Sequence, residues 1–276
     1  MHDAELYTAS HELQKRDAVQ VLTEYLNSMS WKPGDRVLDL GCGPGTVTSQ
    51  ELMPRLPANF GILVGADVSP VMVQHATNRY THPKLRFAQF DLSKDIRGTS
   101  EISALGFDKI FSFYCLHWIP DQRKAVSNIY RLLRTGGEIL LVFLAKCPIF
   151  EVYSALCQKP EWRIYMTDAH RFISPYQQST DPGEEFSKVL LDTGFEVVDC
   201  ECRESKYSYN TVACLKESMK AVNPFLERIP TELHEEYLAD CLMEAEKQKF
   251  VETNNNIEQK VSSFSYEIIV AHARKI

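Results

Sequence analysis

The feature that most constrains this chain is a glycine-rich segment, Val37-Leu38-Asp39-Leu40-Gly41-Cys42-Gly43-Pro44-Gly45-Thr46. An apolar run ends at Asp39, a tight turn follows, and a helix-compatible stretch begins at Val47. Only a backbone without side chains allows both such a turn and the close approach of a ligand. The segment therefore predicts a strand, a ligand-binding loop and a helix in direct succession.

The spacing of the glycines separates two kinds of nucleotide loop. A dinucleotide loop reads G-x-G-x-x-G, whereas here the third glycine comes one position early, at Gly45, and Thr46 fills the next place. A shorter loop that follows an acid suits a cationic nucleoside bearing an amino acid. Glycine turns also occur without any ligand, so the case depends on Asp39, the strand before the loop and the helix after it. In these features the segment resembles motif I of the methyltransferases that use S-adenosyl-L-methionine.

Composition limits the alternatives. The chain has 276 residues, of which 44% are hydrophobic and 24% charged, and this balance is typical of a globular protein with a large core. A net charge of −7 argues against a nucleic-acid substrate. The sequence has neither a membrane-length apolar run nor a signal peptide. Eight cysteines without metal-site or disulfide spacing predict no metal and a reducing, cytoplasmic location.

Strand and helix signals alternate along the chain. We expect strands at 36–40, 61–66, 85–90, 108–113, 138–144, 195–204 and 264–273. We expect helices at 10–28, from Ser69-Pro70 onward, and at 121–133, 185–193, 211–222 and 231–250. Thr135-Gly136-Gly137 and Gly194 should end two of these helices, and 251–260 should be a polar loop. This order predicts an α/β fold with a doubly wound, mostly parallel, seven-stranded sheet.

Long stretches between the core elements predict a cover over one edge of the sheet. We assign 31–144, 185–206 and 261–276 to the core. The remaining segments, 1–30, 145–184 and 207–260, would form a helical lid over the carboxyl ends of the strands, where ligands of open α/β sheets bind.

Two acids follow predicted strands and are candidates for cofactor binding. Asp67 ends the second strand, 26 positions after Gly41, where nucleotide folds place a ribose-binding acid. An NAD enzyme would use the same acid, and Asp67 could also be a solvated strand-end residue. Asp91 distinguishes the two cofactors better. S-adenosylmethionine enzymes place at this position an acid that accepts a hydrogen bond from the adenine amino group. The cofactor set we predict is Asp39, Gly41, Cys42, Gly43, Gly45, Asp67, Val68, Asp91, Leu92 and Ser112, although packing would also explain Cys42.

The substrate that receives the methyl group should bind at the end of the fourth strand. The sequence there is Ser112-Phe113-Tyr114-Cys115-Leu116-His117-Trp118-Ile119. Aromatic runs are commonly core, but polar tips at a strand's carboxyl end face a cleft. Trp118 offers one indole N–H donor. Gln14, by pattern alone, reads as an exposed helix residue.

From end to end, the chain resembles the insect juvenile hormone acid O-methyltransferases. The segments that carry the resemblance include 4–7, 14–18, 37–43, 64–69, 111–119, 148–153, 171–176, 221–225 and 271–275. The resemblance implies that Gln14 and Trp118 hold the substrate carboxylate. No general base is needed for a carboxylate acceptor, so His117 is expected to orient rather than to remove a proton.

The implied substrate is a sesquiterpenoid acid, farnesoic acid or its epoxide, juvenile hormone acid. We predict that its tail contacts residues of the aromatic-rich segments: Tyr114, Phe150, Tyr153, Phe172, Ile173 and Tyr176. Three other functions remain open: a paralogue acting on another lipophilic or small carboxylic acid, an NAD(P)-dependent oxidoreductase, and a non-catalytic hormone-binding module. The sequence does not distinguish the two acids, and it leaves open whether the protein is a homodimer.

Overall fold

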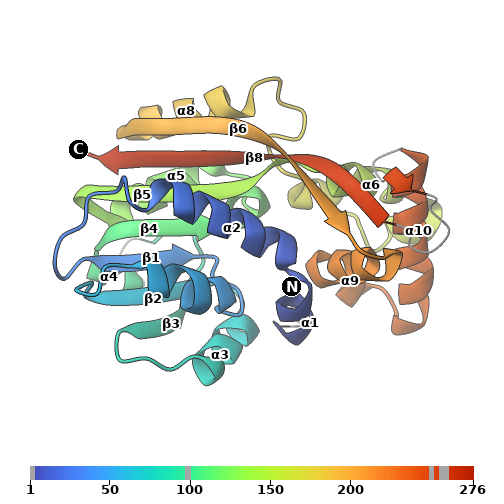
Figure 1. Ribbon diagram of the computed structural model, residues 1–276. Helices are drawn as coiled ribbons and strands as arrows, with labels where there is room; N and C mark the ends of the chain where they lie inside the picture. Colours follow the sequence, from blue (N-terminus) through green and yellow to red (C-terminus); the bar gives the residue numbers. More distant parts are fainter. Residues whose placement is uncertain (1–3, 97–100, 249–251, 255–260) are drawn as a thin grey trace.

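A twisted sheet runs through the centre of the molecule in the computed structural model, which describes residues 4–96, 101–248, 252–254 and 261–276 (Figure 1). The strand order is β3-β2-β1-β4-β5-β8-β6, and a short β7 pairs with β8 outside this order. The strands are β1 (Arg36–Leu40), β2 (Ile62–Asp67), β3 (Leu85–Gln89), β4 (Phe107–Phe113), β5 (Leu133–Lys146), β6 (Phe195–Tyr209), β7 (Glu252–Asn254) and β8 (Val261–Lys275).

Helices cover both faces of the sheet and its right-hand end in Figure 1. They are α1 (Ala4–Ser10), α2 (Glu12–Tyr25), α3 (Pro70–Arg79), α4 (Glu101–Leu105), α5 (Gln122–Leu132), α6 (Pro148–Leu156), α7 (Pro160–Arg163), α8 (Pro182–Thr193), α9 (Val212–Val222) and α10 (His234–Lys247). A π-helical turn at Val47–Leu52 follows the glycine loop, and a 3₁₀ turn, Leu116–Trp118, follows β4.

The direction of the strands places the site. Strands β1 to β5 are parallel, whereas β8 is antiparallel to both of its neighbours. Strand β1 lies between β2 and β4, so the chain winds outward from it in both directions. Ligands of such sheets bind at the carboxyl ends of the strands beside this switch point. The predicted fold, a doubly wound and mostly parallel sheet with seven principal strands, is confirmed.

Two apolar cores lie on opposite faces of the sheet. The first packs α2, α6, α9 and α10 against one face, and the second packs α5 and α8 against the other. Strand β5 contributes to both, because Leu140 and Val142 belong to the first core and Ile139, Leu141 and Phe143 to the second. Burial on both faces explains why this strand is apolar at consecutive positions rather than alternating.

Three local predictions were wrong. The helix expected at 10–28 is shorter, α2 at Glu12–Tyr25, and a separate helix, α1, precedes it; His11 separates the two, with its Nδ1 3.0 Å from the carbonyl oxygen of Tyr7 at the end of α1. Helix α5 ends at Leu132 rather than at the glycines, because the buried Leu133 already pairs with Phe107 of β4. Residues 252–254 form β7 instead of a loop, and the rest of 251–260 lies outside the described residues.

Other boundaries are as predicted. Ser69 caps α3 by accepting a hydrogen bond from the backbone N–H of Met72, with Pro70 in the first turn. Gly194 ends α8 in the left-handed conformation. Beyond the carboxyl ends of β4 and β5, α6 packs on α10, and α9 lies beside α1 (Figure 1).

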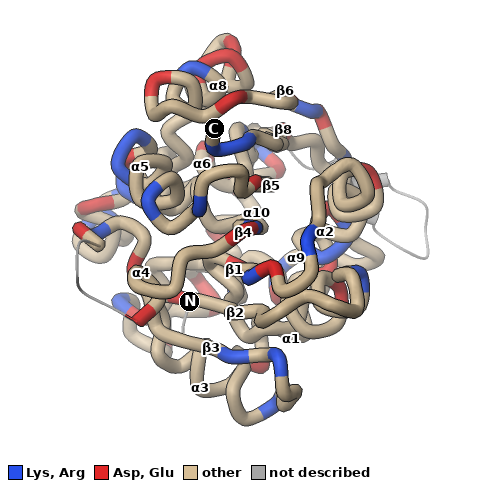
Figure 2. Tube along the Cα trace, turned by 90° about the vertical axis from the view of Figure 1, so that its left-hand side faces the viewer, with Lys and Arg blue, Asp and Glu red and all other residues tan. Residues whose placement is uncertain are grey.

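Charge is dispersed over the face that Figure 1 shows at its left. Figure 2 shows acidic and basic residues interspersed along the elements there rather than gathered by sign. Within the described residues, none of the helices combines the length and apolarity that crossing a bilayer needs. The same part of the chain holds no cluster of three or more His, Cys, Asp or Glu residues suited to a metal ion.

Candidate active site

The glycine loop is shaped by contacts that leave no room for side chains. Gly41, Gly43 and Gly45 all have positive φ, at 75°, 53° and 79°. A Cβ on Gly41 would lie 2.4 Å from the Cβ of Cys115, and one on Gly45 would lie 2.8 Å from the Phe87 ring. A Cβ on Gly43 would meet only the Tyr7 ring, at 3.8 Å. Gly41 and Gly45 therefore serve packing of the loop, while Gly43 borders open space.

Asp39 supports the loop from beneath. Its carboxylate accepts a 2.6 Å hydrogen bond from the Thr48 hydroxyl of the π-helical turn, and burial raises its pKa to about 7. Burial also raises the pKa of the neighbouring Cys42 thiol, so this cysteine is not a reactive thiolate at neutral pH.

Asp67 joins the end of β2 to the glycine loop. One carboxylate oxygen accepts from the backbone N–H of Gly43 and the other from that of Ser69, both at 2.9 Å. Burial raises its pKa even though both hydrogen bonds favour the ionised form. Asp67 thus ties the loop to the end of β2, and it also borders the cleft described next.

A cleft of about 450 Å³ opens at the carboxyl ends of β1, β2, β3 and β4, a size within the range of small-molecule sites. The predicted cofactor residues that border it are Gly41, Gly43, Asp67, Val68, Asp91 and Leu92. At its far edge Asp91 accepts hydrogen bonds from the backbone and hydroxyl of Ser93. Partial burial raises the pKa of Asp91, but these bonds and Lys94 outweigh it and leave the pKa below its usual range.

The four other predicted cofactor residues lie behind this surface. Asp39 and Cys42 border a small recess beneath the loop. Ser112 is buried and donates a 2.8 Å hydrogen bond to the Leu40 carbonyl, which ties β4 to β1. Neither Ser112 nor Gly45 borders the cleft, and both hold the elements that form it.

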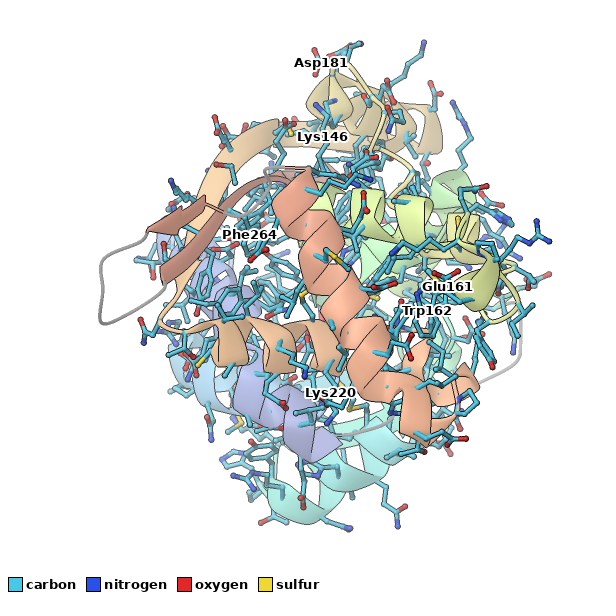
Figure 3. The ribbon with its side chains drawn as sticks, turned by 90° about the vertical axis from the view of Figure 1, so that its right-hand side faces the viewer. Lys146, Glu161, Trp162, Asp181, Lys220 and Phe264 are labelled. Carbon is cyan, nitrogen blue, oxygen red and sulfur yellow. The ribbon has the colours of Figure 1, made fainter. Side chains whose placement is uncertain are left out.

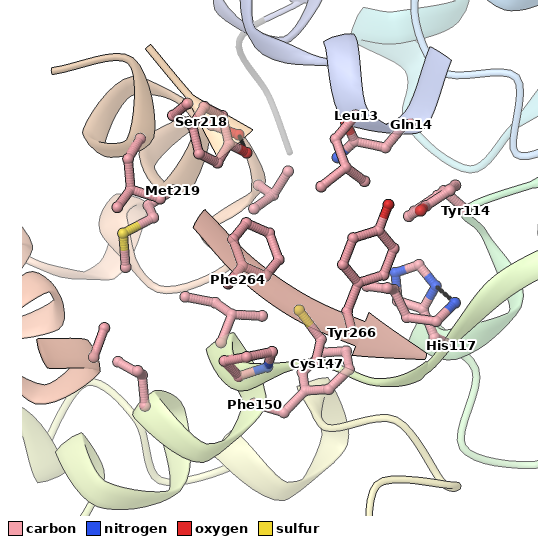
Figure 4. Close-up of a pocket in the computed structure, with 18 of the residues that line it drawn as sticks. Leu13, Gln14, Tyr114, His117, Cys147, Phe150, Ser218, Met219, Phe264 and Tyr266 are labelled. Carbon is pink, nitrogen blue, oxygen red and sulfur yellow. Dashed lines mark hydrogen bonds between the residues drawn. The ribbon is translucent and has the colours of Figure 1, made fainter. Parts of the chain in front are cut away.

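An apolar cavity adjoins the cleft (Figure 4). It lies between α2, the end of β4, α6, α9 and β8. Its lining is Tyr7, Leu13, Gln14, Tyr114, His117, Trp118, Leu144, Cys147, Pro148, Ile149, Phe150, Val152, Tyr209, Leu215, Ser218, Met219, Val222, Ala245, Phe264 and Tyr266. Tyr7, Tyr114, Trp118 and Val222 border both the cavity and the cleft, and these four therefore mark the junction between the two spaces.

Gln14 and Trp118 meet at this cavity although 104 positions separate them in the chain. Gln14 also borders the recess beside Gly41 and Gly43. Its buried amide oxygen has no hydrogen-bond partner among the described residues. This oxygen is a hydrogen-bond acceptor, and the donor that the Gln14 side chain can offer to a carboxylate is its amide NH₂ group.

His117 is buried beside Trp118, with ring centroids 4.7 Å apart, and its Nδ1 lies 3.4 Å from the backbone nitrogen of Leu144. Burial lowers its pKa to about 3. The imidazole is therefore neutral at physiological pH, which suits a residue that packs and orients its neighbours.

A buried carboxylate that sequence reasoning missed holds the junction. Asp17, on α2, accepts hydrogen bonds from the hydroxyls of Tyr114 at 2.5 Å and Tyr266 at 2.6 Å, and pairs with Arg16 at 2.7 Å. Tyr114 is the described non-glycine residue with positive φ, at 59°. Such backbone strain persists where surroundings enforce it, and here the Asp17 bond does so. The sequence offered one indication of this role, because Asp17 is an acid on the same helix as Gln14.

The predicted tail-binding aromatics are divided between locations. Phe150 borders the apolar cavity, and Phe172 borders the cleft with its ring 6.5 Å from that of Trp118. Tyr153 is fully buried behind the cavity against Phe225. Ile173 is half-buried against the first apolar core and borders neither the cavity nor the cleft.

Tyr176 lies on the other face of the sheet, with its ring 5.9 Å from Phe143 and 6.1 Å from Phe186. The turn before it is held by Ser174, which donates to the Leu144 carbonyl. This position departs from the expectation that Tyr176 contacts the substrate, and the physical reason is its packing in the second core.

The remaining cavity residues come from segments whose local sequence did not indicate substrate binding. Tyr209, Leu215, Ser218 and Met219 come from the end of β6 and from α9, and Phe264 from β8. Figure 3 shows Phe264 between β8 and α9, while Trp162 lies beside α10, where its indole donates to Asp240 at 2.8 Å. Only the three-dimensional path of the chain brings these segments to Gln14.

Comparison with known proteins places this site in a family. Residues 37–137 match the model of a methyltransferase domain. Juvenile hormone acid O-methyltransferase from Bombyx mori is 40% identical over all of this chain and 98% of its own length. The Drosophila melanogaster protein of the same name is also 40% identical, over all of this chain and 93% of its own.

Solved structures resemble the fold at low identity. A methyltransferase structure from Bacillus halodurans matches with a TM-score of 0.56 and 20% identity, covering 94% of this chain and 99% of that one. A phosphoethanolamine N-methyltransferase from Haemonchus contortus, bound to S-adenosylhomocysteine, matches with a TM-score of 0.51 and 18% identity, covering 94% of this chain and 52% of that one. At these identities the likeness concerns the fold.

Fold and cleft together define an S-adenosylmethionine-dependent methyltransferase. Within that class, the chain belongs to the juvenile hormone acid O-methyltransferases. The residues present fit the cofactor, since Gly43 leaves the loop open toward the cleft and Asp67 offers carboxylate oxygens beside it.

Proposed function

We propose that this protein esterifies the carboxylate of a sesquiterpenoid acid, farnesoic acid or juvenile hormone acid. The observation that carries the proposal is that Gln14 and Trp118 both line an apolar cavity, and that Trp118 also borders the cleft that contains Asp67. Two neutral donors in the wall of an apolar space suit an acid with a hydrocarbon tail. The names of the Bombyx and Drosophila relatives support the same substrate class.

The acceptor chemistry explains why the site needs no base. A carboxylic acid with a pKa near that of Glu, about 4.3, is already ionised at neutral pH. S-adenosylmethionine, when bound, supplies a methyl group on a positively charged sulfur. The protein has to align the carboxylate oxygen with that methyl group and to keep water away.

Neutral donors are suited to this task. In our proposal the Gln14 amide and the Trp118 indole N–H hold one carboxylate oxygen and leave the other free to react. A Lys or Arg in their place would stabilise the charged ground state, and that charge disappears in the transition state. His117, neutral and with its ring tilted by 48° against that of Trp118, would fix the orientation of the indole, and Tyr114 would shape the junction.

We propose that the predicted cofactor residues act in two ways, some by direct contact with the cofactor and others by supporting the loop and strands. Gly41, Gly43, Asp67, Val68, Asp91 and Leu92 would contact it, since they border the cleft. Asp39, Cys42, Gly45 and Ser112 would act from behind by holding the loop and strands in place.

The tail would lie along Phe150 and the residues of α9 and β8. Each buried CH₂ contributes about 0.8 kcal/mol, so burial of the sesquiterpenoid tail would help to position the carboxylate. We propose that segments 1–30, 145–184 and 207–260 act as the lid. Phe172 would contribute at the junction, and Tyr153 and Ile173 would support the cavity wall.

The cellular setting is also a proposal. Eight unpaired cysteines fit a reducing cytoplasm. A net charge of −7, with acidic and basic residues interspersed on the side that Figure 2 shows, supports a small-molecule rather than a nucleic-acid substrate. Whether the enzyme works as a homodimer can be measured by analytical ultracentrifugation.

The direct test is methyl transfer. The purified protein, incubated with cofactor labelled in the methyl group and either acid, should yield an extractable labelled methyl ester. No ester from these acids or from other terpenoid and fatty acids would refute the substrate class. An ester from a different carboxylic acid alone would point to a paralogous function.

A further inference from the structure

The polar groups of the apolar cavity fall into two sets that lie apart. One set includes Trp118 and Tyr114 at the junction with the cleft, and Gln14, which borders the cavity and the recess beside Gly41 and Gly43. The other is a pair of hydroxyls, Tyr209 at the end of β6 and Ser218 on α9, whose oxygens are 2.7 Å apart. Figure 4 shows Ser218 on the opposite side of the cavity from Tyr114 and His117.

Other polar side chains of this wall are engaged elsewhere. The Tyr266 hydroxyl donates to Asp17, and His117 faces the Leu144 backbone nitrogen. The Cys147 thiol is a weak donor, with a pKa raised to about 12 by burial. Within the described lining, Tyr209 and Ser218 are therefore the hydroxyls that remain for a ligand away from the junction.

We infer that the Tyr209–Ser218 pair is a second polar subsite that recognises an ether-type oxygen, such as an epoxide, at the far end of the substrate's apolar tail. The inference rests on the proposed function, because it assumes an acid held at Gln14 and Trp118. An epoxide oxygen only accepts hydrogen bonds, so the subsite must supply a donor.

The hydroxyl pair can supply that donor at small cost. Either oxygen can be the donor in the Tyr209–Ser218 bond, and Ser218 also reaches the Ser10 carbonyl, at the long distance of 3.4 Å. If Ser218 rotates to donate to Tyr209, only this long contact is lost and the phenol O–H is released toward the cavity. Burial raises the pKa of Tyr209 to about 12, so the phenol remains protonated at neutral pH.

The same pairing explains why a plain hydrocarbon tail would still be accepted. Without an epoxide the two hydroxyls satisfy each other, and no buried donor is left without a partner. The ring of Tyr209 is held in place by Tyr207, at a centroid distance of 4.9 Å, and by Phe264, at 6.1 Å. The subsite should therefore favour the epoxide without rejecting the unepoxidised acid.

The test compares farnesoic acid with its terminal epoxide as substrates of wild-type protein and variants. In Tyr209→Phe the ratio of kcat/KM for the epoxide to kcat/KM for farnesoic acid should fall about two- to tenfold, the range for one neutral hydrogen bond. The change should lie in KM rather than kcat, because the subsite is remote from the reacting atoms. Ser218→Ala should not lower the ratio, because it leaves the Tyr209 donor in place.

The matched control is Tyr207→Phe, which removes a hydroxyl from the neighbouring ring, outside the cavity lining. Its ratio should equal that of the wild type. An unchanged ratio in Tyr209→Phe, or an equal change in Tyr207→Phe, would overturn the inference. Turnover of both acids with such a result would leave the proposed function intact, whereas turnover of neither acid by the wild type would refute that function itself.

Discussion

The cleft and the apolar cavity are built in opposite ways. The cleft lies at the ends of four adjacent parallel strands, and its floor at the glycine loop is set by the backbone: Gly41 and Gly43, with positive φ, border it, and the N–H groups of Gly43 and Ser69 bind Asp67. The cavity is formed by side chains from segments that stretch from Tyr7 to Tyr266.

This contrast explains how one fold serves many acceptors. A loop whose glycines are fixed by close packing tolerates little change, so the cofactor end is shared across a superfamily. A cavity walled by side chains of α6, α9 and β8 can change with each substitution. The four residues at the junction, Tyr7, Tyr114, Trp118 and Val222, are the place where the fixed and variable parts must agree.

The largest effect is expected where the backbone leaves no room. In Gly41→Ala the new Cβ would meet Cys115 at 2.4 Å in a backbone with φ of 75°. We expect the free energy of unfolding to fall by about 3 kcal/mol or more, and cofactor binding to be lost. Urea denaturation and calorimetry measure the two effects.

Gly136→Ala is the matched control, because Gly136 has φ of 77° but no atom within 4 Å of an added Cβ. It should lose only about 1–2 kcal/mol, the strain of a left-handed alanine, and should bind the cofactor normally. Equal losses in the two variants would show that close packing of the loop is not what requires Gly41.

The second prediction concerns the acid that links loop and cleft. Asp67→Ala should lower cofactor affinity about tenfold or more, because hydrogen bonds to a charged group contribute about 1.5–3 kcal/mol each. Asp67→Asn, which keeps an acceptor for a backbone N–H, should lie between the wild type and alanine. Calorimetry that finds unchanged affinity in Asp67→Ala would reduce Asp67 to a structural strand-end residue.

The third prediction moves to the cavity side of the junction. Gln14→Ala and Trp118→Phe should each reduce transition-state stabilisation by about 1–3 kcal/mol. The double variant should lose less than the sum, since residues that act on one carboxylate are not additive. Cofactor affinity should barely change, which separates this effect from that of Asp67. Strictly additive losses of kcat/KM would show that the two donors do not share a carboxylate.

The same contrast decides what could be predicted from the sequence. Strands β1, β2 and β4 were placed within one residue at each end, and Ser69 was identified as a cap, because these signals are local. The positions of Asp67 and Asp91 at the cleft edge followed from their places after parallel strands. Local order along the chain is sufficient where the site lies on one edge of a sheet.

The cavity could not be derived in this way. Pattern alone made Gln14 a surface residue, and only family resemblance placed it with Trp118. Tyr209 and Ser218 gave no indication of their place, and Asp17 gave only its position on the same helix as Gln14, since the neighbours of all three in space are distant in sequence. Tyr176 was expected in the substrate set because it lies in an aromatic-rich segment, but composition does not say which face of a sheet a ring covers.

The smallest effect is expected from pH, and it tests whether the cavity contains a base. The substrate carboxylate is ionised above about pH 5, and burial lowers the pKa of His117 to about 3. We therefore expect kcat to show no titration of His117 between about pH 6 and about pH 9. His117→Phe should lower kcat through lost positioning and leave the shape of the profile unchanged. A rise in the wild-type rate with a midpoint near the ordinary histidine pKa, about 6.5, that His117→Phe abolishes would instead make His117 the general base, whereas a rise that the variant keeps would report Asp39, whose pKa burial raises to about 7.

His117 should also affect stability in a way that can be separated from catalysis. The unfolded chain protonates this imidazole below about pH 6.5, whereas the folded protein keeps it neutral down to about 3. Because the unfolded state then binds more protons, the free energy of unfolding should fall as pH decreases through this window. His117→Phe should make that decrease less steep. An equally steep decrease in the variant, measured by urea denaturation at several pH values, would show that other groups cause it and that the buried imidazole is not held neutral.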